Sequence, residues 1–210
     1  MSILRTLLAS LLVLAAGVFA LSAVTDRFRA FTSEAALRIS VREHPRAVPP
    51  VLLQTAAGKT VGFAGLRGHW LLVDFIYTRC MTYCSVQGSQ FARLQQQLAG
   101  PIANGKVLLV SISFDPAHDG PAQLAAYQQR SGIHGAGWIA ARPVNPAGLD
   151  ALMRVFGVTA VSDGLGGYLH NSAINMVDPR GRLVAIMNWN SPKAALRYVL
   201  RRHDNQVASR

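Results

Sequence analysis

Long apolar runs divide the chain into segments whose length and spacing predict their structure. The run from Trp70 to Tyr77 is nearly continuous and rich in β-branched and aromatic residues, which is typical of a strand covered on both faces. From residue 81 to 98, apolar residues instead recur at roughly helical spacing, and Thr78 can cap this helix. The pattern predicts a central strand that passes directly into a helix.

The other apolar segments predict an alternation of strands and helices. We expect hairpins over 51–63 and 173–187, strands over 106–114 and 138–141, and helices over 121–129, 146–156 and 192–202. This order is typical of a thioredoxin-like α/β fold, in which a central mixed sheet is flanked by helices. In that fold, the residues that follow the first long strand occupy the active position.

The first apolar segment is long enough to cross a bilayer. Residues 3–24 interrupt their apolar run only at Arg5, and a hydrocarbon core of about 30 Å needs roughly 20 such residues. A short charged start and small residues near the end also fit a secretory signal with a cleavage site. We predict an uncleaved signal anchor in the bacterial inner membrane with the domain in the periplasm; a cleaved periplasmic form is the alternative.

The charges around this segment oppose that orientation. Arg27, Arg29, Arg38 and Arg42 follow it, whereas Arg5 and the amino terminus precede it. The positive-inside rule alone would therefore leave the domain in the cytoplasm. We still expect export, because large domains translocate largely regardless of charge and the chemistry described below suits an exported protein.

Composition shifts suggest four parts of the chain. We expect a transmembrane helix over 1–24, an extended linker over 25–49, a thioredoxin-like domain over 50–204 and a tail over 205–210. Half of the 210 residues are hydrophobic, which is enough for a full core.

The net charge of +11 favours negatively charged partners, such as nucleic acid, an anionic membrane surface or acidic proteins. We find no helix-turn-helix, zinc finger or basic and aromatic sheet face, so we expect no nucleic acid. Attraction to an anionic membrane surface or to acidic proteins remains. Lys193, Arg197, Arg201 and Arg202 are expected to form the solvated face of the last helix.

Cys80 and Cys84 lie where the central strand passes into the helix. Residues at i and i+4 share a helix face with Cβ atoms about 5 to 6 Å apart, so both sulfurs can converge on one atom. Arg79 and the helix N-terminus should lower the pKa of the Cys80 thiol. The alternative is a plain disulfide, which would close a very short loop and stabilise little.

A third ligand is expected from the strand that faces the cysteine helix. His170 lies at the entry to that strand, where a thioredoxin would have a proline. Thiolates select Cu(I), and imidazole suits copper in either oxidation state. A structural zinc site would want a fourth protein ligand, and the sequence supplies none obviously. The residues therefore favour copper.

The sequence resembles the Sco/SenC family of membrane-anchored copper proteins, which assist assembly of the binuclear copper-A centre of cytochrome oxidase. The matching stretches are FIYTRCMTYC (75–84), SISFDPAHDGPAQL (111–124) and YLHNSAINMVDPRGRLV (168–184). The similarity covers residues 50 to about 203. The family often has proline directly after each cysteine, where this chain has Met81 and Ser85.

This resemblance implies a specific site and task. Cys80, Cys84 and His170 would bind one copper ion, as Cu(I) or Cu(II). The protein would pass copper to the cytochrome c oxidase subunit that carries the copper-A site, or reduce that subunit's cysteines. It would be a carrier rather than a turnover enzyme, with other periplasmic copper carriers or thiol reductants as further partners.

Three carboxylates are candidates for supporting roles. Asp115 and Asp119 resemble the family's D-x-x-x-D segment and would support the copper site or meet a partner; the alternative is that they cap a loop before a helix. Asp74 matches the buried acid that handles protons in thioredoxins, or is hydrogen-bonded in the core with a raised pKa.

Two other classes of function remain open. A metal-independent thiol-disulfide oxidoreductase would use Cys80 and Cys84, with Asp74 and the thioredoxin order in its favour and the longer cysteine spacing and missing proline against it. The other class is an anchored interaction module with a structural disulfide.

Overall fold

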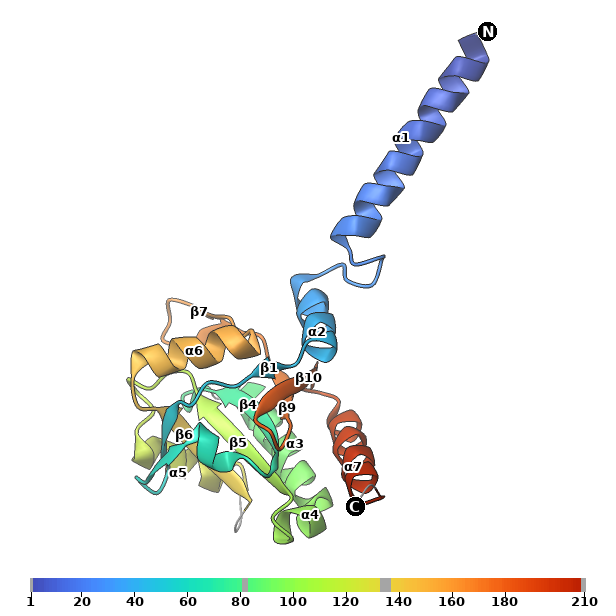
Figure 1. Ribbon diagram of the computed structural model, residues 1–210. Helices are drawn as coiled ribbons and strands as arrows, with labels where there is room; N and C mark the ends of the chain where they lie inside the picture. The colour runs from blue at the N-terminus through green and yellow to red at the C-terminus, as the bar shows by residue number, and fades with distance from the viewer. Residues whose placement is uncertain (1, 81–82, 133–136, 209–210) are drawn as a thin grey trace. The chain divides into compact units, whose positions relative to one another are not determined.

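The computed structural model describes residues 2–80, 83–132 and 137–208, without the side chains of residues 2, 83–87 and 203–208 (Figure 1). The described chain divides into two compact units, Met1–Glu43 and His44–Arg210. Each unit is treated by itself below.

The first unit contains two helices, α1 (Ser2–Val24) and α2 (Ser33–Glu43). Within α1, Ile3–Val24 is long and apolar enough to cross a membrane, with a mean hydropathy of 2.5. This confirms the single apolar N-terminal helix.

The sequence predicts an extended linker over 25–49, but residues 33–43 within it form helix α2. The Thr32 hydroxyl caps this helix by accepting a hydrogen bond from the Ala35 amide at 3.1 Å. Arg38 then pairs with Glu34 one turn away, at 2.5 Å. A cap and a pair spaced by four residues each favour a helix locally.

The second unit is built on one mixed sheet in the order β1-β10-β9-β4-β5-β6-β2-β3. Strands β4, β5 and β6 are parallel to one another, whereas the other pairings are antiparallel. The strands are β1 (Arg46–Ala47), β2 (Leu52–Thr55), β3 (Thr60–Gly62), β4 (Trp70–Ile76), β5 (Val107–Ser113), β6 (Trp138–Pro143), β9 (Ala173–Val177) and β10 (Arg182–Asn188). The predicted thioredoxin-like α/β architecture is confirmed.

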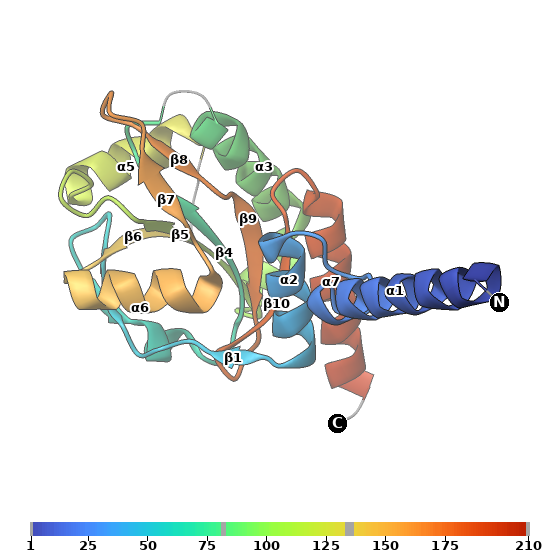
Figure 2. The same ribbon diagram turned by 90° about the horizontal axis from the view of Figure 1, so that it is seen from above.

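Helices cover both faces of this sheet (Figure 2). Helices α3 and α5 connect consecutive parallel strands, so right-handed crossovers place them on one face, which they share with α7, while α6 covers the other. The helices are α3 (Tyr83–Gln97), α4 (Ala99–Ala103), α5 (Pro121–Arg130), α6 (Pro146–Phe156), α7 (Pro192–Ala208) and the short 3₁₀ helix η1 (Phe63–Leu66).

Strand β4 is the centre of the core, and all seven of its residues are buried. Alternate side chains point to opposite faces of a strand. Leu72 accordingly packs in the cluster that contains Leu94 of α3 and Val199 of α7. Phe75 instead contacts Phe156 of α6, with ring centroids 5.2 Å apart. The residues that follow β4 are therefore anchored by a rigid strand.

A separate two-stranded ribbon joins α6 to β9. It consists of β7 (Ala160–Ser162) and β8 (Tyr168–His170), paired antiparallel so that Ala160 lies opposite His170. The sequence did not predict it, because both strands are short and largely exposed and have no alternating apolar pattern.

Candidate metal centre

The candidate site lies at the carboxyl ends of β4 and β5, which meet at one edge of the sheet because the two strands are parallel. Tyr77 follows β4, and Phe114 follows β5. The His170 ring packs against both, with centroids 6.1 Å from Tyr77 and 5.0 Å from Phe114. Although 90 residues later in the chain, His170 is thus held beside the segment that leads to Cys80.

The His170 imidazole is prepared to act as a neutral ligand. Burial lowers its pKa, and the opposing effect of the Asn171 backbone is smaller. Its Nδ1 is buried and forms no hydrogen bond with any residue that the structure describes. A buried ring nitrogen without a partner is costly unless something else binds it.

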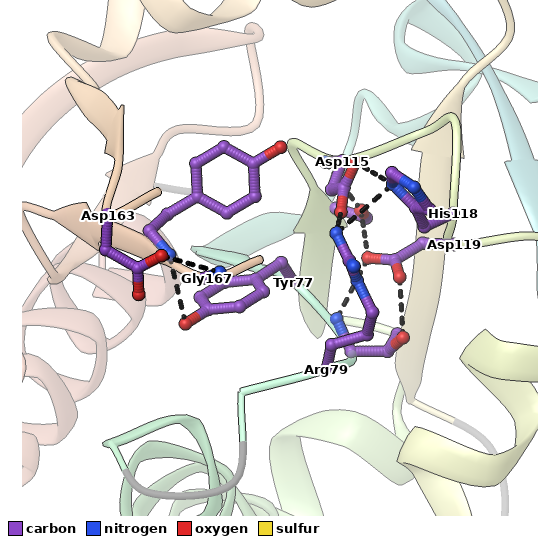
Figure 3. A network of polar contacts seen from close by, with 10 residues as sticks. Tyr77, Arg79, Asp115, His118, Asp119, Asp163 and Gly167 are labelled. Atoms are coloured by element: carbon purple, nitrogen blue, oxygen red, sulfur yellow. Dashed lines mark hydrogen bonds and ion pairs between the residues drawn. The ribbon is translucent and has the colours of Figure 1, made fainter. Parts of the chain in front are cut away.

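The ribbon that carries His170 is fixed at its turn and at the start of β8. Asp163 accepts hydrogen bonds from the Leu165 and Gly167 amides, at 2.8 and 2.9 Å, and these bonds lower the pKa of Asp163. The Tyr168 amide donates to the Tyr77 hydroxyl at 3.4 Å. Figure 3 shows the contact of Asp163 with Gly167, beside Tyr77. The turn and Tyr77, which follows β4, therefore both constrain β8.

The two cysteines are described to different extents. The Cys80 amide donates to the Tyr77 carbonyl at 3.3 Å, and the Cys80 side chain is half-buried. Cys84 lies in the first turn of α3, but its side chain is outside the described residues. Among the side chains that are described, no three histidine, cysteine, aspartate or glutamate residues group closely enough to hold a metal. The predicted set of Cys80, Cys84 and His170 stays a prediction.

Asp119 clamps the residue two positions before Cys80. It is fully buried and accepts hydrogen bonds from the Thr78 amide at 2.9 Å and the Thr78 hydroxyl at 2.5 Å. The Ser113 hydroxyl donates a third, at 2.5 Å. Arg130 donates to the Thr78 carbonyl at 3.1 Å, so Thr78 is held at its amide, hydroxyl and carbonyl.

The expectation that Thr78 caps the cysteine helix is wrong. Residues 79 and 80, which directly follow Thr78, are not helical, and the Thr78 hydroxyl donates to Asp119. Nor does Asp119 cap the helix that follows it, because α5 begins after Gly120 without a side-chain cap. Both aspartates of the D-x-x-x-D segment point instead to the segment before Cys80.

Asp115 holds the residue directly before Cys80. Its carboxylate, 4% exposed, lies 2.8 Å from Arg79 Nη2 and 2.8 Å from His118 Nδ1 (Figure 3). Burial raises the pKa of Asp115, but the hydrogen bonds from His118 and Arg79 outweigh it, so the net pKa lies below the usual value. Because Asp115 offsets the charge of Arg79, Arg79 favours a Cys80 thiolate less than its sequence position suggested.

Asp74 is fully buried in the middle of β4, opposite Ser111 of β5. By strand alternation it shares a face with Leu72, which packs against α3. Its role in proton transfer stays a prediction.

Sequence reasoning missed the side chains that position the site. Arg130 lies at the end of α5, and nothing around it in the sequence indicates a contact with Thr78. The rings of Tyr77, Phe114 and Tyr168 read as core residues, yet Tyr77 and Phe114 pack against the His170 imidazole and Tyr168 packs against both of them.

Comparisons with known proteins agree with this architecture. The family model described as SCO1/SenC matches residues 40–203. The chain belongs to the SCO1/SenC family. A protein of Stutzerimonas stutzeri described as a putative copper-binding protein is 30% identical over 187 residues, covering 87% of this chain and 88% of that protein.

Solved structures of Sco proteins share the fold of this family member. Bradyrhizobium japonicum ScoI, solved with copper bound, is 26% identical with a TM-score of 0.61, covering 74% of this chain and 98% of that one. BsSco, described as a member of the Sco family of cytochrome c oxidase assembly proteins, is 23% identical with a TM-score of 0.66, covering 75% and 94%.

Proposed function

We propose that this SCO1/SenC protein binds one copper ion through Cys80, Cys84 and His170. The observation that carries the proposal is the state of His170: a neutral imidazole, packed against the rings of Tyr77 and Phe114, whose buried Nδ1 has no partner among the described residues. Thiolates and a neutral imidazole suit Cu(I), and the imidazole also suits Cu(II). A copper-bound structure of the Bradyrhizobium relative supports the same cargo.

The two halves of the proposed site are held in different ways. Asp119 and Arg130 fix Thr78, and Asp115 engages Arg79, so the chain leading to Cys80 starts from a defined position. The ribbon of β7 and β8 holds His170 against the rings of Tyr77 and Phe114. Support of this kind around a metal ligand raises affinity by limiting the ligand's freedom before the metal arrives.

We propose that the receiving protein is the cytochrome c oxidase subunit that carries the copper-A site. BsSco's description as a member of a family of cytochrome c oxidase assembly proteins supports this assignment. Three protein ligands leave room for a donor of the receiving protein to enter before a donor of the carrier leaves. Copper can then move by ligand exchange without being released to water.

The ribbon supplies a surface next to the site for this encounter. Leu165 is 92% exposed at its turn, and Leu169, which precedes His170, is 73% exposed. Exposed apolar side chains beside a functional residue are typical of a protein contact. We propose that the receiving subunit contacts Leu165 and Leu169.

A second candidate function is thiol reduction at the same pair of cysteines. The fully buried Asp74 in the strand before Cys80 favours it, because a buried carboxyl group can accept or donate a proton during thiol exchange. In this reaction Cys80 and Cys84 form a disulfide as the target disulfide takes up two electrons and two protons. His170 would then be dispensable.

An anaerobic Cu(I) titration of the reduced full chain in detergent, against a competing chelator, tests the copper site. We expect one tightly bound Cu(I) per chain, and an affinity loss of more than about 100-fold in His170→Ala. His69→Ala is the matched control, because His69 precedes β4 at its opposite end. Equal Cu(I) affinity in wild type and His170→Ala contradicts the three-ligand site. Catalytic reduction of a protein disulfide by a chain that binds no copper favours the oxidoreductase.

A further inference from the structure

Helix α7 presents a row of cations on its outer side. Lys193, Arg197 and Arg201 recur every four residues, and all three are exposed. This spacing places them one turn apart on one side of the helix, over a length of about 12 Å. Next to the row, Arg202 lies over the ring of Tyr198, at 4.8 Å from its centroid.

The packing of α7 fixes the direction in which this row points. Ala195 and Val199 are fully buried in the core cluster shared with α3 and the sheet. Leu196 and Leu200 are partly buried against the same cluster. The apolar side of the helix is therefore occupied, and the cationic side faces outward.

No carboxylate neutralises this row within the described part of the chain. None of the described ion pairs involves its three members. From residue 192 to 202 the sequence holds four cations and no acid, and the first acid to follow is Asp204. Four cations on so short a surface create a strongly positive local potential.

We propose that the α7 row, defined as Lys193, Arg197 and Arg201, binds an anionic lipid surface. Lipid headgroups are recognised by charge alone, and each Lys or Arg near such a surface adds about fivefold to the partition constant. Among the described side chains of α7, no large apolar residue is exposed. A protein partner would instead favour an apolar centre, such as the exposed leucines of the ribbon.

The rest of the chain makes such contact favourable. Helix α1 is apolar and long enough to span a bilayer, and a tether of this kind keeps a weak surface-binding site at high effective concentration. Within the second unit, α7 begins at the end of the sheet where β4 ends, because β10 runs parallel to β4, and it then packs along one face of the sheet beside α3 (Figure 2). Lipid contact would use the outward side of α7, which carries none of the proposed copper ligands.

Hydrogen–deuterium exchange of the full chain in lipid nanodiscs tests this proposal. We compare discs of phosphatidylcholine alone with discs that contain one-third phosphatidylglycerol. Exchange in α7 should be several-fold slower in the anionic discs, and 0.5 M NaCl should abolish the difference because salt screens exposed charges. The measurement needs no copper, so it is independent of the metal site.

Matched triple variants separate a specific surface from net charge. Lys193→Gln, Arg197→Gln and Arg201→Gln together should remove the protection; glutamine keeps the helix propensity, and circular dichroism verifies the fold. Lys59→Gln, Lys106→Gln and Arg154→Gln remove the same charge from exposed positions elsewhere and should retain it. Three results would overturn the proposal. The first is equal exchange of α7 in the two kinds of disc, and the second is equal loss of protection in both triple variants. The third is protection of α7 that requires an acidic protein and not anionic lipid.

Discussion

Thr78 is the residue on which the geometry before Cys80 depends. Its amide and hydroxyl donate to Asp119, and its carbonyl accepts from Arg130. Asp119 lies 41 residues after Thr78 and is fully buried. Thr78 and Ser113 together supply the three donors that a buried carboxylate needs, and Arg130 of α5 holds the Thr78 carbonyl separately.

Asp119→Asn should destabilise the protein. Asparagine replaces one of the two acceptor oxygens of Asp119 with a donor, so at least one of the hydrogen bonds from the Thr78 amide, the Thr78 hydroxyl and the Ser113 hydroxyl is lost or reversed. We expect a loss of about 1 to 3 kcal/mol in the free energy of unfolding, the range for buried donors left unsatisfied. Urea unfolding of the full chain in detergent measures it. Asp150→Asn, on the exposed side of α6, is the control and should change stability by less than about 0.5 kcal/mol. Equal stability of Asp119→Asn and wild type would show that the clamp contributes nothing.

At the scale of elements, burial decided which parts of the fold the sequence could predict. The bounds of α6 agree with the prediction, and β4, β5 and the hairpin of β9 and β10 agree to within one or two residues. These elements bury one or both faces, so their apolar spacing reports their structure. The short elements β1, β7, β8 and α4 bury little and have no such pattern.

The sequence predicted the candidate ligands but not the contacts that position them. Cys80 and Cys84 were marked by their place after a buried strand, and His170 by its place before another. The contacts that position them join residues 36 to 91 positions apart, as Arg79 with Asp115 and Tyr77 with Tyr168 do. Such contacts follow from strand order and crossover, which local patterns do not encode.

The ribbon of β7 and β8 should act in transfer and not in copper binding. Its exposed leucines are not members of the proposed ligand set, whereas a receiving protein would bury them. Leu165→Ser with Leu169→Ser should therefore slow Cu(I) transfer to a soluble copper-A domain by about tenfold, since each buried leucine contributes to docking.

Two measurements distinguish this from general damage. Cu(I) affinity of the double variant should equal that of wild type, and Leu52→Ser, an exposed leucine on β2, should transfer copper at the wild-type rate. Unchanged transfer in the double variant would place the receiving protein on another surface.

At the scale of the whole molecule, the apolar helix and the candidate metal site lie in different units of the chain. The first unit holds an apolar helix that can cross a membrane, and the second holds the thioredoxin-like domain with its site at one edge of the sheet. The net charge of +11 lies partly on the exposed side of α7. Membership of the SCO1/SenC family connects this arrangement to copper and to oxidase assembly.

X-ray absorption at the copper edge tests the central claim most directly. The full chain is reduced, loaded with one Cu(I) and measured without oxygen. We predict two sulfur scatterers and one imidazole nitrogen around each copper, with the nitrogen lost in His170→Ala and retained in His69→Ala. A copper shell without imidazole in the wild-type protein, or one that His170→Ala leaves unchanged, would contradict the account.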